Sequence, residues 1–399
     1  MSPNTPDPLV ALDTATAMTT TLGARPDTVL PLGPFLGDLR SRRAEIEAQR
    51  RLPDDILYGL AAVGLRRLCV PRRFGGDEID PVGFARVLEE VAKADAATAW
   101  CVWTYGSAPW VLAYAADDVA AEVWSTGPDV LIASLLSPSG VTRPAAGGYR
   151  LTGRWPFASG SIGAHWLVCR ATVAGTPGAL RLMLVPAASV RCLDTWSSAG
   201  LCGTGSGDVV VDDVFVPEAF AIDFDAGSRR RPEPLYAFPH RGLACGSAAI
   251  ALGIARDALD ELVSLAATKR TAFGAGPLAE RPAVQAGAAR AEAELGAARA
   301  FLYQCTATAW ESVLRDGDVP ARHQAMLRAA ANHACRAAVR VVDFAYTTAG
   351  GTSVYRSSPL QRHFRDIHTV TQHFFHSDEI DEMAGRVLWG VHDDLPSRL

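Results

Sequence analysis

Lysine is scarce in this sequence, and long apolar runs and a basic stripe are absent from it. Only Lys93 and Lys269 are lysines among the 38 Lys and Arg residues, and the basic residues are spread along a chain of net charge −5. We therefore expect no nucleic-acid partner. No apolar run approaches the ~18 residues of a transmembrane helix, so no membrane partner is expected either. Residues 1–30 lack the positive start and apolar middle of a signal peptide.

Paired cysteines and a dinucleotide motif are also absent. The eight cysteines include no Cys-x-x-Cys pair, and most stand in apolar segments. This pattern predicts buried thiols in a reducing cytoplasm, with neither disulfides nor a metal site. No Gly-x-Gly-x-x-Gly motif joins a strand to a helix, and the glycine-rich segment 203–207 opens onto a β-run. We therefore expect the chain to have no NADH site of its own.

Hydrophobic periodicity divides the 399 residues into regions of an α+β protein. Residues 1–35 are expected to form a disordered leader. Helical spacing indicates an N-terminal helical domain over 36–129, and short β-rich runs indicate a β-barrel or sandwich domain over 130–226. Long Ala-rich segments predict a C-terminal helical bundle over 227–399. The predicted strands are 130–136, 149–157, 166–173, 180–185 and 209–216, and the later predicted helices are 242–266, 282–315, 321–349 and 358–391.

Four motifs then occur in a characteristic order. They are Val-Pro-Arg-Arg-Phe-Gly-Gly at 70–76, the run 201–217 ending in Phe-Val-Pro, Arg-Thr-Ala-Phe-Gly at 270–274, and Gln-Arg-His-Phe-Arg-Asp-Ile-His at 361–368. Together they resemble the acyl-CoA dehydrogenase superfamily over nearly the whole chain from residue 36. The resemblance implies that family's fold, with a helical domain, a β-domain and a helical bundle.

The sequence departs from the dehydrogenases at their catalytic base. Many of them carry a glutamate eight residues after the Asp of the Arg-Asp pair, and eight residues after Asp366 stands Phe374, next to His373. The segment Gly-Arg-Trp-Pro-Phe-Ala-Ser-Gly-Ser at 153–161 and Asp-Thr-Trp at 194–196 resemble the two-component flavin-dependent monooxygenases of the hydroxyphenylacetate-hydroxylase type. That resemblance implies an oxygenase component that uses O2 and reduced FMN or FAD, supplied by diffusion from a separate flavin reductase. Through a C4a-hydroperoxyflavin it would hydroxylate a phenolic or polycyclic aromatic substrate, as in natural-product biosynthesis.

The same resemblance assigns roles around the flavin ring. Ser159 matches the family hydroxyl beside flavin N5, Phe157 is expected to contact the cofactor, and Ser161 is the rival for the task of Ser159. His373 would face the substrate, either deprotonating a phenol or hydrogen-bonding to the peroxide, since an ordinary pKa near ~6.5 allows both. Tyr105 is expected to line the substrate pocket, although aromatic residues at helical spacing also fill cores.

Four further positions match family residues that hold the outer part of the flavin. Arg270 and Phe273 resemble residues that contact the FAD pyrophosphate and adenine across a subunit boundary, while Gln285 and Gly350-Gly351 match neighbouring positions. A guanidinium suits a phosphate, but Arg270 could instead cap a helix. The cross-subunit contact implies a homotetramer built as a dimer of dimers.

Simpler explanations stand beside these roles. His368 lies five residues before His373, about 140° around a continuous helix, so we expect it to be structural. His373 and His376 could share a helix face, but nothing nearby completes a metal site. Arg362 and Asp366 have the i, i+4 spacing of an ordinary helix ion pair.

Three other functions remain open at this stage. One is N-oxygenation of an amine or amino sugar on the same fold. Another is an acyl-CoA dehydrogenase with its base in the predicted helix 242–266, where the first acid is Asp257, near the expected end of that helix. The last is a flavin-fold protein retained only for binding.

Overall fold

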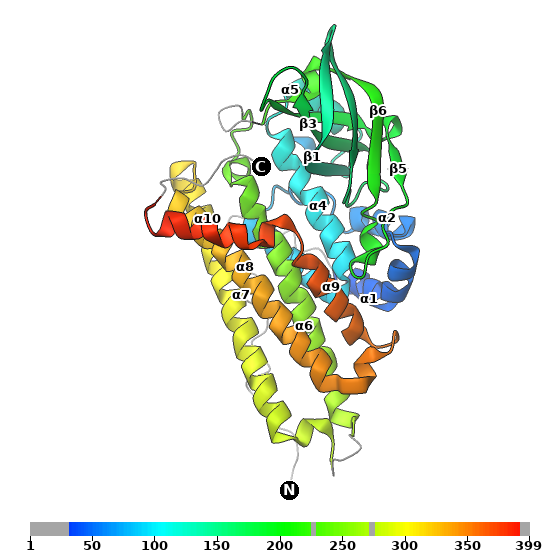
Figure 1. The fold of residues 1–399 in the computed structure, drawn as a ribbon, viewed down its shortest axis with the longest axis vertical. Helices are drawn as coiled ribbons and strands as arrows, with labels where there is room; N and C mark the ends of the chain where they lie inside the picture. The colour runs from blue at the N-terminus through cyan, green and yellow to red at the C-terminus, as the bar shows by residue number, and fades with distance from the viewer. Residues whose placement is uncertain (1–31, 225–228, 271–275, 392–399) are drawn as a thin grey trace.

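The computed structural model describes residues 32–224, 229–270 and 276–391, in which N-terminal helices lead into a β-sheet and then a helical bundle (Figure 1). The first helix begins at Leu32, so residues 32–35 are helical and the expectation of a leader reaching residue 35 was wrong there. Residues 1–31 lie outside the described part. The N-terminal helices are α1 (Leu32–Gln49), α2 (Asp54–Ala62), α3 (Pro81–Ala94), α4 (Ala96–Leu112) and α5 (Asp117–Val123).

Helix α4 is the central element of the molecule. Asp95 caps its start by accepting a 2.7 Å hydrogen bond from the Thr98 amide. Every residue of the helix except Ser107 is buried, which is the pattern of a helix enclosed on all sides. It lies between the sheet and the C-terminal bundle (Figure 1), and so its side chains can reach both.

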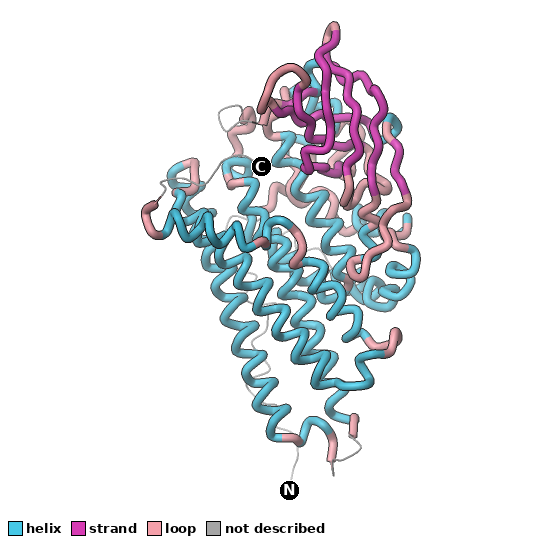
Figure 2. Tube along the Cα trace, in the orientation of Figure 1, coloured by secondary structure: helices cyan, strands magenta, loops and turns pink. Residues whose placement is uncertain are grey.

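The β-domain is one seven-stranded sheet in the order β5-β6-β2-β1-β3-β4-β7, gathered at one end of the molecule (Figure 2). Strand β1 pairs parallel with β3 and antiparallel with β2. It runs nine residues past the predicted end at 136, because 140–145 pair with 148–153 despite their Pro and Gly content. Two short strands were not predicted. The strands are β1 (Ile132–Ala145), β2 (Gly148–Trp155), β3 (Trp166–Val173), β4 (Leu180–Pro186), β5 (Arg191–Leu193), β6 (Asp208–Pro217) and β7 (Ala221–Ile222).

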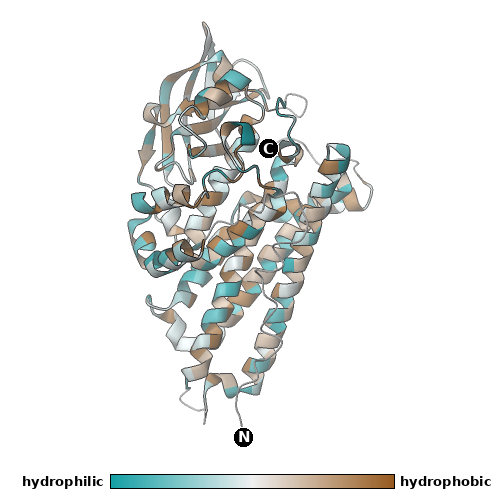
Figure 3. Cartoon of the chain, turned by 180° about the vertical axis from the view of Figure 1, so that it is seen from behind, coloured by the Kyte–Doolittle hydropathy of each residue, from teal (hydrophilic) through white to brown (hydrophobic). Residues whose placement is uncertain are grey.

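The helices of the C-terminal bundle carry both apolar and polar residues (Figure 3), and many of the apolar ones are buried in the core. The stretch His240–Thr268 is long and apolar enough to cross a membrane, but 94% of an apolar 18-residue segment within it is buried in the protein, so we interpret it as a core helix. The predicted helix 358–391 is in fact two helices, since Ser377 and the acids after it favour a new N-terminus at Asp378. The helices are α6 (Ala244–Thr268), α7 (Pro282–Asp316), α8 (Ala321–Ala349), α9 (Pro359–Val370) and α10 (Asp378–Leu388).

Candidate active site

Ser159 stands at the end of a row of hydroxyl groups. Its Oγ lies 3.3 Å from the Trp100 indole nitrogen and 2.6 Å from Ser206 Oγ, and Ser206 Oγ lies 2.7 Å from Thr204 Oγ1. Thr204 donates to the Leu201 carbonyl at 2.8 Å. Each hydroxyl has one proton, and that of Thr204 is used in the bond to Leu201. Ser206 must therefore donate to Thr204, and Ser159 must donate to Ser206. Ser159 accepts from Trp100 and keeps one acceptor site open.

The loop that carries Ser159 has a constrained backbone. Phe157 has a positive φ of 56°, yet its large apolar side chain is 75% exposed. Gly160 also has a positive φ, and a Cβ there would lie 2.7 Å from the Tyr105 ring. Tyr105 is itself buried in the core, where burial raises its pKa. This geometry favours a packing role for Tyr105, beneath the loop, over the substrate contact that was expected.

His373 lies in the turn between α9 and α10, so the expectation of a single helix through His368, His373 and His376 was wrong. Its imidazole sits edge-on to the rings of Trp100, Trp103 and Phe375, at centroid distances of 5.4, 5.3 and 5.0 Å. Burial, with a smaller effect of His376, lowers the pKa of His373 to about 3. The ordinary value near 6.5 expected from the sequence therefore does not hold.

The tautomer of His373 follows from one contact. Its Nδ1 accepts a 3.3 Å hydrogen bond from the Phe375 amide. In a neutral ring the other nitrogen, Nε2, then carries the proton. His373 is therefore arranged to donate a hydrogen bond through Nε2 at neutral pH.

Trp100 joins the two predicted catalytic residues. Its indole nitrogen donates to Ser159, and its ring packs against His373. The sequence alone did not single out Trp100, because nothing local marks the partner of its indole N–H. Ser161 does not join this row of hydroxyl groups, and its Oγ lies 3.9 Å from Cys192 Sγ.

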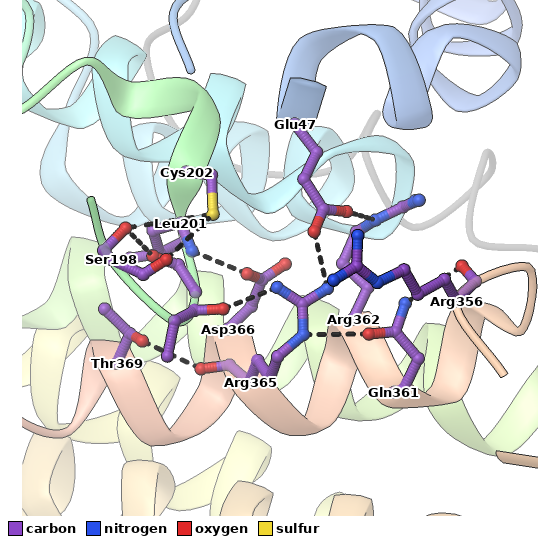
Figure 4. Close-up of polar contacts among 12 residues, drawn as sticks. Glu47, Ser198, Leu201, Cys202, Arg356, Gln361, Arg362, Arg365, Asp366 and Thr369 are labelled. Carbon is purple, nitrogen blue, oxygen red and sulfur yellow. Dashed lines mark hydrogen bonds and ion pairs between the residues drawn. The ribbon is translucent and has the colours of Figure 1, made fainter. Parts of the chain in front are cut away.

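The Arg-Asp signature on α9 fastens that helix to two distant segments. Figure 4 shows the Glu47 carboxylate facing Arg362 and Arg365, at 2.8 and 2.6 Å. Asp366 instead accepts a 2.6 Å hydrogen bond from the amide of Leu201, a residue with a positive φ of 50°. The expected ion pair between Arg362 and Asp366 was therefore wrong, since both residues have long-range partners.

Asp366 is a buried acid with an altered titration. Burial raises the pKa of its carboxyl group to about 7, against the opposing effect of the Leu201 hydrogen bond. Because the hydroxyl row of Ser159 ends on Leu201, Asp366 supports that row from the other side of the same residue.

The residues expected to hold the outer flavin lie far from Ser159 within one chain. Trp103, which contacts His373, donates a hydrogen bond to the carbonyl of Leu243, just before α6 begins. Arg270 follows the other end of α6. The 25 residues of this helix span about 37 Å at 1.5 Å per residue. Lys269 there contacts Thr352 at 2.6 Å, close to Gly350 and Gly351. Gln285 donates to the Ala279 carbonyl at 2.9 Å. Phe273 lies outside the described residues.

Three other groups that were considered for chemistry have structural partners. His368 pairs with Asp343 at 3.0 Å, and His376 is held by Ser247 at 2.9 Å. Asp257, the alternative base, is buried in ion pairs and lies inside α6, eleven residues before its end. Its partners are Arg40, Arg43 and His363, at 2.9, 2.6 and 2.9 Å. In the described ranges no three His, Cys, Asp or Glu side chains are grouped to hold a metal ion.

Comparison with known proteins places the chain in a family. The models of the acyl-CoA dehydrogenase N-terminal and C-terminal domains match residues 37–124 and 245–378. Indole-3-acetate monooxygenase of Pseudomonas putida is 36% identical, covering 92% of this chain and 97% of its own. The oxygenase component of the FADH2-dependent resorcinol hydroxylase of a Rhizobium species is 31% identical, covering 88% and 91%.

Solved structures agree with the sequence comparisons. The 3-HSA hydroxylase of a Rhodococcus species is similar at a TM-score of 0.85 and 30% identity, covering 90% of this chain and 96% of its own. XiaF of a Streptomyces species, in complex with FADH2 and glycerol, gives a TM-score of 0.86 at 25% identity and covers 92% and 96%. The fold, the absent carboxylate base and these relatives lead to one conclusion: the chain belongs to the acyl-CoA dehydrogenase superfamily, among its flavin-dependent monooxygenases.

Proposed function

We propose that this protein is the oxygenase component of a two-component monooxygenase that hydroxylates a phenolic or fused aromatic substrate. The observation that carries the proposal is the arrangement around Trp100, where an acceptor hydroxyl and a neutral imidazole take the place of a carboxylate base. Among the residues that the structure describes, no carboxylate bonds to Ser159, Trp100 or His373. Relatives named for indole-3-acetate and for resorcinol point to the same substrate class.

The chain presents groups that fit a flavin. An exposed Phe157 beside the open acceptor site of Ser159 suits an apolar ring with an N–H at its edge. A reduced flavin supplied by a separate reductase provides the two electrons that activate O2. Ser159 would hold the N5 proton in place, since its own proton is committed to Ser206. Loss of that proton to water is thereby slowed.

His373 would act on the substrate side as a hydrogen-bond donor. Because its Nδ1 lone pair is taken and its pKa lies far below neutrality, Nε2 can offer a proton to an oxygen atom but cannot remove one. This supports the hydrogen-bonding role over the phenol-deprotonating role, both of which the sequence left open. The rings of Trp100, Trp103 and Phe375 shield the same space from water.

No observation favours the other functions. Dehydrogenation needs a base near the thioester, and Asp257 is occupied by Arg40, Arg43 and His363. The relatives described above are named for aromatic compounds, so amine N-oxygenation gains no support from them.

We further propose a cytoplasmic homotetramer that receives its FMN or FAD by free diffusion. Arg270 follows the end of α6 that is distant from Trp103 and Leu243, and this supports a contact between Arg270 and a flavin held by a neighbouring copy. All eight cysteines are free thiols and six of them are buried, as suits a reducing compartment.

The test is turnover with a panel of phenols and indoles. Purified chain is mixed aerobically with reduced FMN or FAD, and hydroxylated product and H2O2 are both quantified. We expect product with at least one aromatic substrate, and a shift toward H2O2 in Ser159→Ala. If no aromatic compound is hydroxylated and an acyl-CoA bleaches bound FAD, the protein is a dehydrogenase and the proposal is wrong.

A further inference from the structure

A second cavity lies behind the aromatic site and is separated from it by buried rings. It measures about 340 Å³ and is enclosed by the C-terminal part of α4, the segment before α6, and the turn between α7 and α8. This volume lies in the range of small-molecule sites. Neither Ser159 nor His373 lines the cavity, and the rings of Trp103 and Phe375, which contact His373, are buried in the core. A molecule in this cavity would therefore lie apart from Ser159 and His373.

The protein does not neutralise the two arginines that line this cavity from α8 and from the segment before α6. Arg328 is only 4% exposed, and its Nη1 is buried without a hydrogen-bond partner. In the part of the chain that the structure describes, neither Arg328 nor Arg241 forms an ion pair or a side-chain hydrogen bond. Burial, with a smaller effect of Arg241, lowers the pKa of Arg328 to about 10. A buried guanidinium without an opposite charge destabilises a fold.

The other polar groups of the cavity add donors and little negative charge. His240 lines it with an Nδ1 that has no hydrogen-bond partner, and its ring is neutral at pH 7 because burial lowers its pKa to about 4. Arg229 adds a third guanidinium, which donates to the Arg231 carbonyl at 3.0 Å. Asp318 is the one acid among the described lining residues, and it is exposed to solvent. The cavity therefore has a net positive charge.

The start of α6 also adjoins the cavity. The short turn His240–Leu243 leads into this helix, and Arg241 and Gly242 of the turn line the cavity. Pro239 and Leu243, at the N-caps of the turn and of the helix, supply no capping side chain. The positive end of a 25-residue helix is thus available to an anion. A helix N-terminus beside guanidinium groups is an arrangement that suits phosphate.

We propose that this cavity binds a phosphate group, free or esterified to a small molecule, between the Arg241 and Arg328 guanidinium groups and the start of α6. Phosphate fits better than a carboxylate, because a phosphate group carries nearly two negative charges at neutral pH and faces two guanidinium groups. The apolar walls formed by Trp110, Phe238 and Leu327 suit the organic part of a phosphate ester. This site does not depend on the proposed hydroxylation.

The first experiment measures anion affinity by calorimetry. The flavin-free full chain is titrated in chloride buffer of constant ionic strength with inorganic phosphate, phenyl phosphate and acetate. We expect phosphate to bind at least about tenfold tighter than acetate, and Arg328→Met to weaken phosphate about tenfold, as the loss of a charged hydrogen bond does. Arg241→Met, at a half-buried position, should weaken phosphate as well. Arg328→Lys should retain part of the affinity, and Arg322→Met, an exposed control on α8, should retain all of it.

The second experiment follows unfolding in urea. Without phosphate, Arg328→Met should unfold at the same urea concentration as wild type or a higher one, because a buried charge without a partner has been removed. Phosphate should raise the unfolding midpoint of wild type, since it binds only the folded chain. It should leave the midpoint of Arg328→Met unchanged.

Each other outcome is decisive. If wild type does not bind phosphate, binds acetate equally well, or loses no affinity in Arg328→Met and Arg241→Met, the phosphate site does not exist. Earlier unfolding of Arg328→Met without phosphate would show that the protein itself satisfies this guanidinium, and would also overturn the proposal. If Arg328→Met weakens reduced FMN about tenfold relative to reduced riboflavin, the cavity holds the cofactor phosphate and is not a separate site. Tighter binding of phenyl phosphate than of inorganic phosphate would support an ester as the ligand, and equal binding would support the free ion.

Discussion

Replacing Asp366 by asparagine should change how the stability of the protein depends on pH. Burial raises the pKa of this carboxyl from 3.8 to about 7. Each pKa unit is worth about 1.4 kcal/mol, so the ionised form costs the folded state about 4 kcal/mol relative to the unfolded chain. Since the folded pKa lies above the unfolded one, the folded state binds more protons between the two values. Stability is then fully present below the unfolded pKa and is lost as the pH rises through about 7.

The assay is denaturant unfolding of wild type and Asp366→Asn at fixed protein concentration, between about pH 5 and about pH 8. We expect the wild type to lose about 3 kcal/mol more than the variant over this range, because about two of the three pKa units lie within it. Asparagine keeps an acceptor for the Leu201 amide, so the hydrogen bond is preserved while the charge is removed.

Asp378→Asn serves as the control, because this side chain is 93% exposed. It should follow the wild-type curve. Parallel curves for wild type and Asp366→Asn would refute the claim that Asp366 is a buried acid that titrates near neutrality.

Three further predictions concern the flavin and substrate sites. Ser159→Ala should raise the fraction of oxygen released as H2O2 in a product-to-peroxide assay, and should cost about 1–3 kcal/mol in denaturant unfolding, because Trp100 and Ser206 lose a partner. His373→Phe should abolish most hydroxylation, and wild-type kcat/KM should show no His373 inflection between about pH 6 and about pH 8, because its pKa is about 3. Arg270→Ala should weaken the binding of reduced flavin about tenfold in equilibrium dialysis, since one charged contact with the flavin phosphate is lost.

Each of these variants has a matched control. Ser161→Ala should keep the wild-type ratio of hydroxylated product to H2O2, because the contact of Ser161 with Cys192 is a long, weak one. His368→Ala should hydroxylate normally, and Arg290→Ala, an exposed change on α7, should bind flavin like wild type. If Ser161→Ala releases more H2O2 than wild type and Ser159→Ala does not, the roles assigned to the two serines must be exchanged. An inflection near pH 6.5 that disappears in His373→Phe would show that His373 titrates, and unchanged flavin affinity in Arg270→Ala would remove that residue from the flavin site.

Motif register predicted the fold, because local sequence marks each family motif. It also selected Ser159 and His373, which both contact Trp100 in the structure. The partners of these residues could not be predicted. The Trp100 indole bonds to a serine 59 residues away, and Asp366 bonds to an amide 165 residues away. A local i, i+4 rule chose the wrong partner for Asp366, since tertiary contacts outweigh a weak helix pair. The start of a separate helix at Asp378 could have been predicted from the sequence, because Ser377 precedes three acids in the first turn of α10.

The titration of His373 was also beyond the sequence. An ordinary pKa was assumed, whereas the surrounding rings come from α4 and from the turn after α9 and together shield part of the imidazole from water. Only the folded arrangement shows that this histidine is neutral and that its Nδ1 accepts from the Phe375 amide, which leaves the proton on Nε2.

The most direct test of the central claim is isotopic. The purified protein is mixed under ¹⁸O2 with reduced FMN or FAD and with an aromatic substrate that it turns over. The mass of the product is then measured by mass spectrometry. One ¹⁸O atom per hydroxylated product is the result expected of a monooxygenase. Product oxygen drawn from water, or product formed equally well without O2, would contradict the account.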